Sequence, residues 1–357
     1  MSGLATTKVL SFRHLLTGAV HEFLAAQGMG SEEFSDDVTE IIIALSRYHE
    51  EGAALFPSVF VCDELQGLLD RLGGCDAVRV GSGPRGTETT RRALKHCAPL
   101  GRGPWSIFLV QRDGRYEYGV FRSGDFVLSE SPMQRLRNLH EPSPRILGVV
   151  QLAENVLELR ASGGAGRLVH LSGARTDMPP ATVLLLDLVR VITRDVADDD
   201  RDGAVVFFRR VLIDALRSSH GSLIAVLPSG ERDLGIFSDG LLLATPVDVA
   251  SAVADWRRDG TIAARARVQG LAQLLAGMLS ADGITLLSSD GAIVGYNVFL
   301  HPGPRADEGP RSLGGARQRA FRALCAEVGR GLAAAFVRSQ DGHAECRIAD
   351  ESDPVWG

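Results

Sequence analysis

The stretch Asp282-Gly-Ile-Thr-Leu-Leu-Ser-Ser-Asp-Gly-Ala-Ile-Val-Gly-Tyr-Asn-Val-Phe-Leu300 decides the fold of the C-terminal half of the chain. Its apolar runs, 284–287 and 292–300, flank Ser288-Ser-Asp-Gly291, whose Asp-Gly pair favours the positive φ angles of a tight turn. The pattern predicts two antiparallel strands joined by a hairpin. Asp282-Gly283 precedes the first strand, where a carboxylate beside a residue without a side chain can hold a metal ion close to a ligand.

A polar loop follows this hairpin and leads to Gly314-Gly-Ala-Arg-Gln-Arg319. Arg317 and Arg319 open the helix-like run 320–328. Two guanidinium groups and the N–H groups of a helix N-terminus together form a natural phosphate site. With Asp282 as a metal ligand, they predict a nucleotide site. The alternatives are that Asp282 only caps the entry to the strand and that the two arginines form a solvated helix face.

The composition is that of a globular protein. The 357 residues, 45% hydrophobic and 23% charged, are enough for two domains with a buried core. A net charge of -6 argues against a broad nucleic-acid surface, whereas a small anionic ligand needs only a local cationic pocket. The five cysteines lack C-x-x-C spacing and indicate reduced, structural thiols. The N-terminus lacks a signal-peptide h-region, and no apolar window has the length of a membrane span. We therefore expect a cytoplasmic protein without nucleic-acid or membrane partners.

The N-terminal half predicts a small α+β domain. The expected elements are helices at 9–27 and 35–51, a strand and a helix within 58–72, a hairpin of 105–111 with 116–121, and short strands including 156–160 and 167–171. None of these elements by itself indicates a catalytic or binding site.

The N-terminal half also contains a glycine-rich sequence. Gly81, Gly83 and Gly86 form G-x-G-x-x-G after a strand-like run and before a helix-like run, which is the context of a dinucleotide-binding loop. Pro84 stiffens this segment and removes an N–H donor. A phosphate-binding loop and an ordinary glycine-rich connection therefore both stay open. A dinucleotide-dependent enzyme would lose ligand binding on Gly83→Val.

An acidic run at 195–202 marks the expected domain boundary. Asp198, Asp200 and Asp202 resemble the first half of a calcium loop, but Arg209 stands where that loop needs a bidentate glutamate. We interpret the run as a solvated linker. The predicted organisation is an N-terminal α+β sensor or regulatory domain at 1–178, a linker helix (181–192) and acidic linker within 179–203, a C-terminal domain at 204–350, and a tail at 351–357.

The C-terminal domain alternates helices and strands. Helices are expected at 204–218, 247–256 and 261–280, strands at 221–228, 233–237 and 241–243, and a last hairpin of 332–338 with 344–348. Because some neighbouring strands are antiparallel, the predicted class is α/β (mixed α+β), with a mixed central β-sheet flanked by helices on both faces.

Taken in this order, residues 221–348 resemble the diadenylate cyclase (DAC, DisA N-terminal-like) domain family, whose members join two ATP molecules into cyclic di-AMP. The resemblance is carried by Gly221-Ser-Leu-Ile224, Asp282-Gly-Ile284, Gly315-Ala-Arg-Gln-Arg319 and Val337-Arg-Ser-Gln340. These match the family's Gly-Ala/Ser-Leu-Ile, Asp-Gly-Ala, Gly-Thr-Arg-His-Arg and Val-Ser-Glu motifs. A second Asp-Gly-Ala begins at Asp290, but the spacing to Arg317 fits the family when Asp282 is the catalytic aspartate.

The resemblance implies a nucleotidyltransferase with ATP as substrate. Asp282 would bind Mg²⁺ or Mn²⁺, which polarises the α-phosphate for attack by the 3′-hydroxyl of a second ATP, and Arg317 and Arg319 would hold the triphosphate. The matching nucleotide-binding positions are Gly283, Ile284, Phe299, Leu300, Gly315, Ala316, Gln318 and Ser339. Each active site makes half of the product, so two domains must meet face to face.

The sequence departs from the family pattern at three positions. Ile284 replaces alanine, Gln318 replaces the histidine between the arginines, and Gln340 replaces the last acid, with Asp341 behind it. Glutamine donates and accepts hydrogen bonds but carries no charge. Two functions therefore follow from the resemblance: an active cyclase regulated by the N-terminal domain, or a catalytically inactive receptor for ATP or a cyclic dinucleotide.

Overall fold

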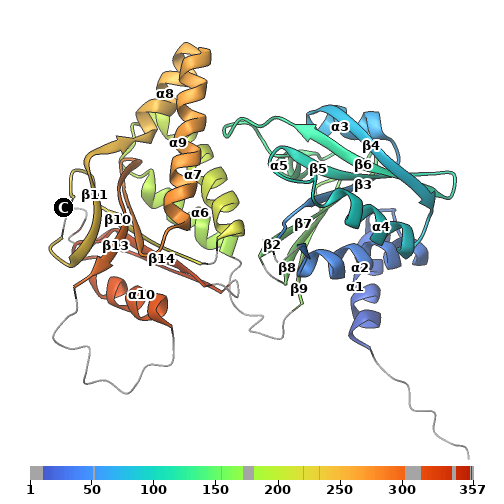
Figure 1. Cartoon of the computed structure of the whole chain (residues 1–357), viewed down its shortest axis with the longest axis horizontal. Helices are drawn as coiled ribbons and strands as arrows, with labels where there is room; N and C mark the ends of the chain where they lie inside the picture. Colours follow the sequence, from blue (N-terminus) through green and yellow to red (C-terminus); the bar gives the residue numbers. More distant parts are fainter. Residues whose placement is uncertain are drawn as a thin grey trace, which may run out of the picture. The chain divides into compact units, whose positions relative to one another are not determined.

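The computed structural model of the chain describes residues 11–50, 53–153, 155–171, 181–219, 221–232, 234–301, 315–339, 343–353 and 355. The chain divides into two compact units. Unit 1 is Met1–Asp125 with Ser129–Ala174, and unit 2 is Phe126–Leu128 with Arg175–Gly357. Each unit is a mixed sheet with helices packed on it, which confirms the predicted fold class (Figure 1). The acidic run at 195–202, which was expected to mark the domain boundary, lies inside unit 2. Residues 178 and 179, where the predicted N-terminal domain ends, lie outside the described residues.

Unit 1 is built on a seven-stranded sheet, with a separate pair of short strands. The strands of the unit are β1 (His49–Glu50), β2 (Ala53–Ala54), β3 (Ser58–Cys62), β4 (Gly74–Pro84), β5 (Trp105–Arg112), β6 (Arg115–Ser123), β7 (Ile146–Ala153), β8 (Val156–Ala161) and β9 (Gly166–His170). β1 and β2 pair with each other, and the others form a sheet in the order β4-β6-β5-β3-β7-β8-β9. The central strands β3 and β5 are parallel, and the remaining neighbours are antiparallel.

Helices cover both faces of this sheet (Figure 1). They are α1 (Phe12–Ala26), α2 (Glu32–Ser46), α3 (Leu65–Leu72), α4 (Thr87–Cys97) and α5 (Pro132–Asn138). α1, α2 and α4 bury Leu24, Ile41 and Leu94 in one core, while α3 and α5 bury Leu68 and Leu136 in another. The predicted helices, the β5–β6 hairpin and the strands β8 and β9 are confirmed, with shifted ends.

The structure corrects both interpretations of the glycine-rich sequence. Gly81 and Gly83 lie inside β4, an 11-residue strand paired antiparallel with β6, and Gly86 caps α4. A Cβ at Gly81 would lie 2.6 Å from the Tyr118 hydroxyl oxygen, and one at Gly83 would lie 2.6 Å from the Thr89 Oγ1. The two glycines therefore leave room for the side chains of Tyr118 and Thr89. The sequence is not a dinucleotide-binding loop, because such a loop requires a parallel βαβ unit. It is not a connection either, because most of it belongs to the strand β4.

Two cysteines of unit 1 are typical structural thiols. Cys62 and Cys97 are buried free thiols. Burial raises the pKa of Cys62 to about 12 and that of Cys97 to about 11. Both side chains therefore stay protonated at neutral pH and pack as small apolar groups, as predicted for them.

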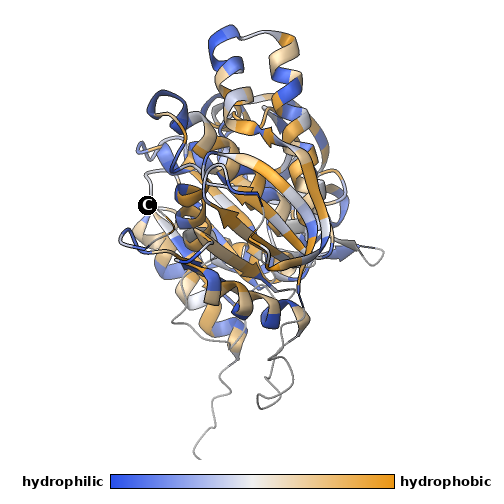
Figure 2. Cartoon of the chain, turned by 90° about the vertical axis from the view of Figure 1, so that its left-hand side faces the viewer, coloured by the Kyte–Doolittle hydropathy of each residue, from blue (hydrophilic) through white to orange (hydrophobic). Residues whose placement is uncertain are grey.

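Unit 2 is built on a six-stranded sheet. Its strands are β10 (Ser222–Leu227), β11 (Phe237–Asp248), β12 (Ile284–Ser288), β13 (Ala292–Leu300), β14 (Ala334–Arg338) and β15 (Ala344–Ile348), in the order β11-β13-β12-β10-β14-β15. β10 and β12 are parallel and the other neighbours antiparallel. Helices cover both faces of the central strands, whose residues are mostly hydrophobic, as are most strand residues in view in Figure 2. The β12–β13 hairpin is confirmed. The short strands expected at 233–237 and 241–243 are wrong, since β11 is one long strand with register shifts.

The helices of unit 2 are α6 (Ala181–Ile192), α7 (Asp198–Ser218), α8 (Val249–Asp259), α9 (Ile262–Ser280) and α10 (Ala316–Glu327). α6 to α9 pack on one face around Leu188, Phe207 and Leu275. α10 packs on the opposite face, where Phe321 and Leu324 meet Leu286 of β12. The prediction of helices on both faces is confirmed.

The linker predicted at 179–203 is wrong for its described part. α6 lies in the core of unit 2, where Leu188 and Ile192 are fully buried. The acidic run belongs to α7, whose first turn contains Asp198, Asp199 and Asp200. Carboxylates are favourable there because the N-terminus of a helix carries partial positive charge. The acidic run is therefore a helix start and not a connection between domains.

Candidate functional site

One end of the unit 2 sheet carries most of the predicted site residues. β10 and β12 begin at this end, and β13 and β14 finish there, because Leu223 pairs with both Ile284 and Val337 while Ile284 pairs with Val298. The segments next to these strand ends contain Asp282, Gly283, Leu300 and Ser339. Positions that are far apart in the chain are thus brought to one edge by the strand directions.

Asp282 and Arg317 form an ion pair at this edge. The Arg317 Nη2 donates to the Asp282 Oδ1 over 3.3 Å, across 35 positions of sequence. The Asp282 side chain is 86% exposed and that of Arg317 is 40% exposed, so both remain accessible to a ligand. Arg317 and Arg319 stand in the first turn of α10, as predicted, and no described side chain caps this helix at Gly315. A cationic helix start therefore faces an accessible carboxylate.

Two glycines bring the backbone close to this pair. Gly283 has a φ of +86°, and a Cβ there would lie 2.9 Å from the backbone of Asn297. Gly221 has a φ of +116°, and a Cβ there would lie 2.9 Å from the Arg317 Nη1. A positive φ angle is unfavourable for a residue with a Cβ, and the neighbouring atoms leave no room for one. Both positions therefore require glycine. Gly283 was predicted as a site residue. Gly221 was not, although its place before a buried strand was visible in the sequence.

A second cluster surrounds Gln318. The Gln318 Nε2 donates to the Glu345 Oε1 over 2.7 Å, and the His343 Nε2 lies 2.9 Å from the same oxygen. Burial acts to raise the pKa of Glu345, but hydrogen bonds from His343 and Gln318 outweigh it and lower the pKa. Ser339 adjoins this cluster, since its Oγ donates to the His343 carbonyl oxygen over 3.0 Å. Sequence reasoning missed Glu345 and His343, because only the pairing of β14 with β15 and the packing of α10 bring them to Gln318.

The lowered pKa of Glu345 predicts a pH-dependent contribution to stability. A carboxyl whose pKa falls below its ordinary 4.5 on folding stabilises the protein above that pH, and the contribution is lost as the pH falls through the lowered value. Glu345→Gln should reduce the free energy of unfolding at neutral pH by less than about 1 kcal/mol, because the group is partly exposed. The difference from wild type should vanish in acid.

Urea unfolding at neutral pH and at about pH 3 measures this effect. The control is Glu351→Gln, which changes an exposed glutamate outside the cluster. It should stay within about 0.5 kcal/mol of wild type at both pH values. A Glu345→Gln difference that persists unchanged in acid would contradict the linkage.

The other predicted positions differ in their environments. Phe299 is 43% exposed on β13, and Leu300 is half-buried against the core beside α10. Gly315, Ala316 and Arg319 are exposed at the start of α10. Ile284, predicted as a nucleotide-binding position, is only 2% exposed and packs in the same core. Gln340 and Asp341 lie outside the described residues.

The donor set at this edge fits a metal that arrives with a nucleotide. In the described part of the chain, no group of three or more His, Cys, Asp or Glu side chains is placed to hold a metal ion. Mg²⁺ usually keeps several waters and is bound through one or two carboxylates together with substrate phosphates. The exposed Asp282 carboxylate can serve as such a single protein ligand.

Asp290 lies at the opposite end of the sheet. Its Oδ2 accepts from the Ser229 Oγ over 2.9 Å, its Oδ1 accepts from the Ser288 Oγ, and Gly291 beside it has a φ of +78°. These contacts confirm Asp290 as a hairpin-turn residue. Asp290 is thus separated from Arg317 by the length of β12.

Comparison with known proteins gave no match, either to a family model or to a curated protein. Among the helices within the described ranges, none is both long enough and apolar enough to cross a membrane.

Proposed function

We propose that unit 2 is a diadenylate cyclase, a nucleotidyltransferase that condenses two molecules of ATP into cyclic di-AMP and pyrophosphate. Unit 1 is its sensor domain. One observation carries the proposal: the Arg317 guanidinium lies 3.3 Å from the Asp282 carboxylate. Sequence motifs selected one residue as a metal ligand and the other as a phosphate ligand. Their contact at one edge of the sheet supports a shared nucleotide site.

The side chains of this edge can perform distinct tasks. Arg317 and Arg319 hold triphosphate oxygens, assisted by the positive end of the α10 dipole. Phe299, which is 43% exposed, offers an apolar surface for adenine. The accessible Asp282 carboxylate holds the divalent metal, and a bound Mg²⁺ or Mn²⁺ supplies charge neutralisation at the phosphates.

In the proposed reaction, the 3′-hydroxyl oxygen of one ATP forms a bond to the α-phosphorus of the other. The bond from that phosphorus to the pyrophosphate oxygen breaks, and the hydroxyl proton passes to solvent. Arg317 and Arg319 stabilise the negative charge that develops on the departing pyrophosphate. The same step with the two nucleotides exchanged closes the ring. Two copies of unit 2 must therefore face each other, since each site makes one phosphodiester bond.

A second candidate function is a receptor that binds ATP or a cyclic dinucleotide without catalysis. The environment of Gln318 favours it, because the side chain is uncharged and its amide donates to Glu345. A neutral amide supplies less stabilisation to developing negative charge than a protonated histidine does.

Incubation of the full chain with ATP and Mn²⁺, followed by chromatographic measurement of cyclic di-AMP, tests the proposal. We expect product, with a specific rate that rises with protein concentration because two copies make each site pair. Calorimetric titration with ATP separates the two functions. ATP binding without product at high protein concentration would leave only the receptor, and absence of both binding and product would overturn both functions.

A further inference from the structure

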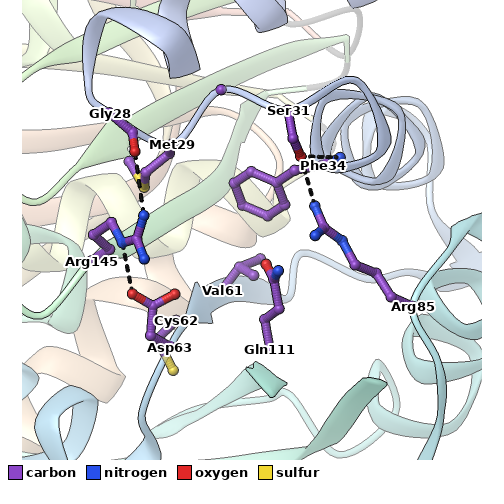
Figure 3. Close-up of a pocket in the computed structure, with 11 residues that line it drawn as sticks. Gly28, Met29, Ser31, Phe34, Val61, Cys62, Asp63, Arg85, Gln111 and Arg145 are labelled. Atoms are coloured by element: carbon purple, nitrogen blue, oxygen red, sulfur yellow. Dashed lines mark hydrogen bonds and ion pairs between the residues drawn. The ribbon is translucent and has the colours of Figure 1, made fainter. Parts of the chain in front are cut away.

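Unit 1 contains a cavity of about 230 Å³ that the proposed cyclase chemistry does not use. It lies at the carboxyl ends of β3 and β5, the parallel pair at the centre of the sheet. Ligands of open α/β sheets bind outside the carboxyl ends of parallel strands. Figure 3 shows side chains from α2, from the strand ends and from two loops around one space, notably Ser31, Phe34, Asp63, Arg85, Gln111 and Arg145.

Arg85 supplies positive charge on one side of this cavity, which we call the Arg85 pocket. Its side chain is 15% exposed and stacks 5.6 Å from the centre of the Phe34 ring. Its Nη2 donates to the Ser31 Oγ over 3.0 Å. Its Nε is buried and, although it makes no hydrogen bond to any described residue, it lies 3.7 Å from the Asp37 Oδ2 and so faces its counter-ion. Donor capacity toward a ligand therefore lies with the two Nη groups, of which Nη2 also donates to Ser31.

The counter-charge of Arg85 lies behind it. Asp37 is 1% exposed, its Oδ2 lies 3.7 Å from the Arg85 Nε, and the same oxygen accepts from the Tyr116 hydroxyl over 2.8 Å. Burial raises the pKa of Asp37. Asp37 thus pairs with the Nε side of the guanidinium, while Arg85 itself lines the pocket.

On the opposite side of the pocket, the positive charge of Arg145 is paired with a carboxylate and is more exposed to solvent. Arg145 donates to the Asp63 Oδ2 over 2.8 Å and to the Gly28 carbonyl oxygen over 3.3 Å, and its side chain is 55% exposed. Glu32 and Glu33 in the first turn of α2 are exposed and do not line the cavity. The negative charges of Asp63, Glu32 and Glu33 repel a ligand that carries several negative charges. The pocket therefore suits a single negative charge placed against Arg85.

We propose that the Arg85 pocket binds a small monocarboxylate, with the carboxylate on Arg85 and the first turn of α2 and the body of the ligand against Phe34, Val61 and Gln111. A guanidinium fork matches a planar carboxylate with two parallel hydrogen bonds. The cavity is smaller than the roughly 300 to 1,000 Å³ of pockets for drug-sized ligands, so the body is no larger than a single ring. This site would give unit 1 a chemical signal to sense, and its binding does not depend on cyclase activity.

Calorimetric titration of the full chain with propionate, benzoate, benzamide and inorganic phosphate tests the site. We expect propionate or benzoate to bind, and benzamide, the neutral analogue of benzoate, to bind at least about tenfold more weakly, because it cannot form a charge-assisted pair. Phosphate should bind more weakly than the carboxylates. Binding of neither carboxylate, equal binding of benzamide and benzoate, or tighter binding of phosphate would each overturn the proposal.

Variants locate the binding. Arg85→Gln should weaken carboxylate binding at least about tenfold, and Arg145→Gln by about threefold, because Arg145 is more solvated. The matched control is Arg112→Gln, which removes a side chain 84% exposed and outside the lining. If Arg85→Gln fails to fold, the Arg145→Gln effect and the benzamide comparison still decide the matter. Equal affinity of wild type, Arg85→Gln and Arg145→Gln would show that the ligand binds elsewhere.

Discussion

Asp282→Asn is expected to lower cyclic di-AMP formation by at least about 100-fold, the cost of removing one stabilising group from a transition state. The change keeps the shape of the side chain but removes the charge that would hold the metal. ATP binding should survive, because the substitution leaves both arginines and the start of α10 in place. Product formation and calorimetric ATP binding, measured on the same preparation, test this separation of catalysis from binding.

Asp290→Asn is the matched control, since Asp290 begins the other Asp-Gly sequence of the same hairpin. It accepts hydrogen bonds from Ser229 and Ser288 at the far end of β12. The variant should retain activity within about threefold and lose roughly 1 kcal/mol of stability from a weakened turn. If Asp290→Asn inactivates the protein while Asp282→Asn does not, the alignment of the motif is wrong and the metal site lies at the other end of the sheet.

Interior elements of both units could be predicted because burial leaves a hydrophobic pattern. The helix at 181–192 and the strand at 292–300 were predicted at their observed bounds. β11 was predicted as two shorter pieces, and β4 only as a strand-like run before Gly81. Both are edge strands and most of their residues are exposed, so neither shows the alternation that marks a half-buried strand.

The candidate site could be predicted only where a local motif carries it. Asp282 and Arg317 belong to such motifs, and the structure brings them into contact. Glu345 and His343 carry no motif, and their approach to Gln318 depends on how α10 packs over β14 and β15. Ile284 was predicted from a motif as a nucleotide-binding position, and the structure shows that its side chain packs in the core.

Arg317→Gln is expected to raise the ATP concentration needed for half-maximal activity and to lower the maximal rate, with a combined loss in kcat/KM of about 100- to 1,000-fold. Arg317 provides a charged fork at the start of α10, where the helix dipole also favours anions. Glutamine can still donate hydrogen bonds, but it has no charge for the triphosphate or for the departing pyrophosphate. Steady-state kinetics and ATP titration measure the two parts of the effect.

The comparison of this variant with Arg330→Gln decides whether position or overall charge matters. Arg330 is exposed just beyond the other end of α10, so its replacement removes the same charge from the unit without touching the edge that carries Asp282. We expect activity within about twofold of wild type for Arg330→Gln, because an exposed charge at that distance is screened by salt. Equal losses in both variants would mean that the arginines act only through the general field of unit 2. A loss confined to Arg317→Gln, together with retained ATP binding in Asp282→Asn, would assign phosphate binding to the helix start and metal binding to the strand entry.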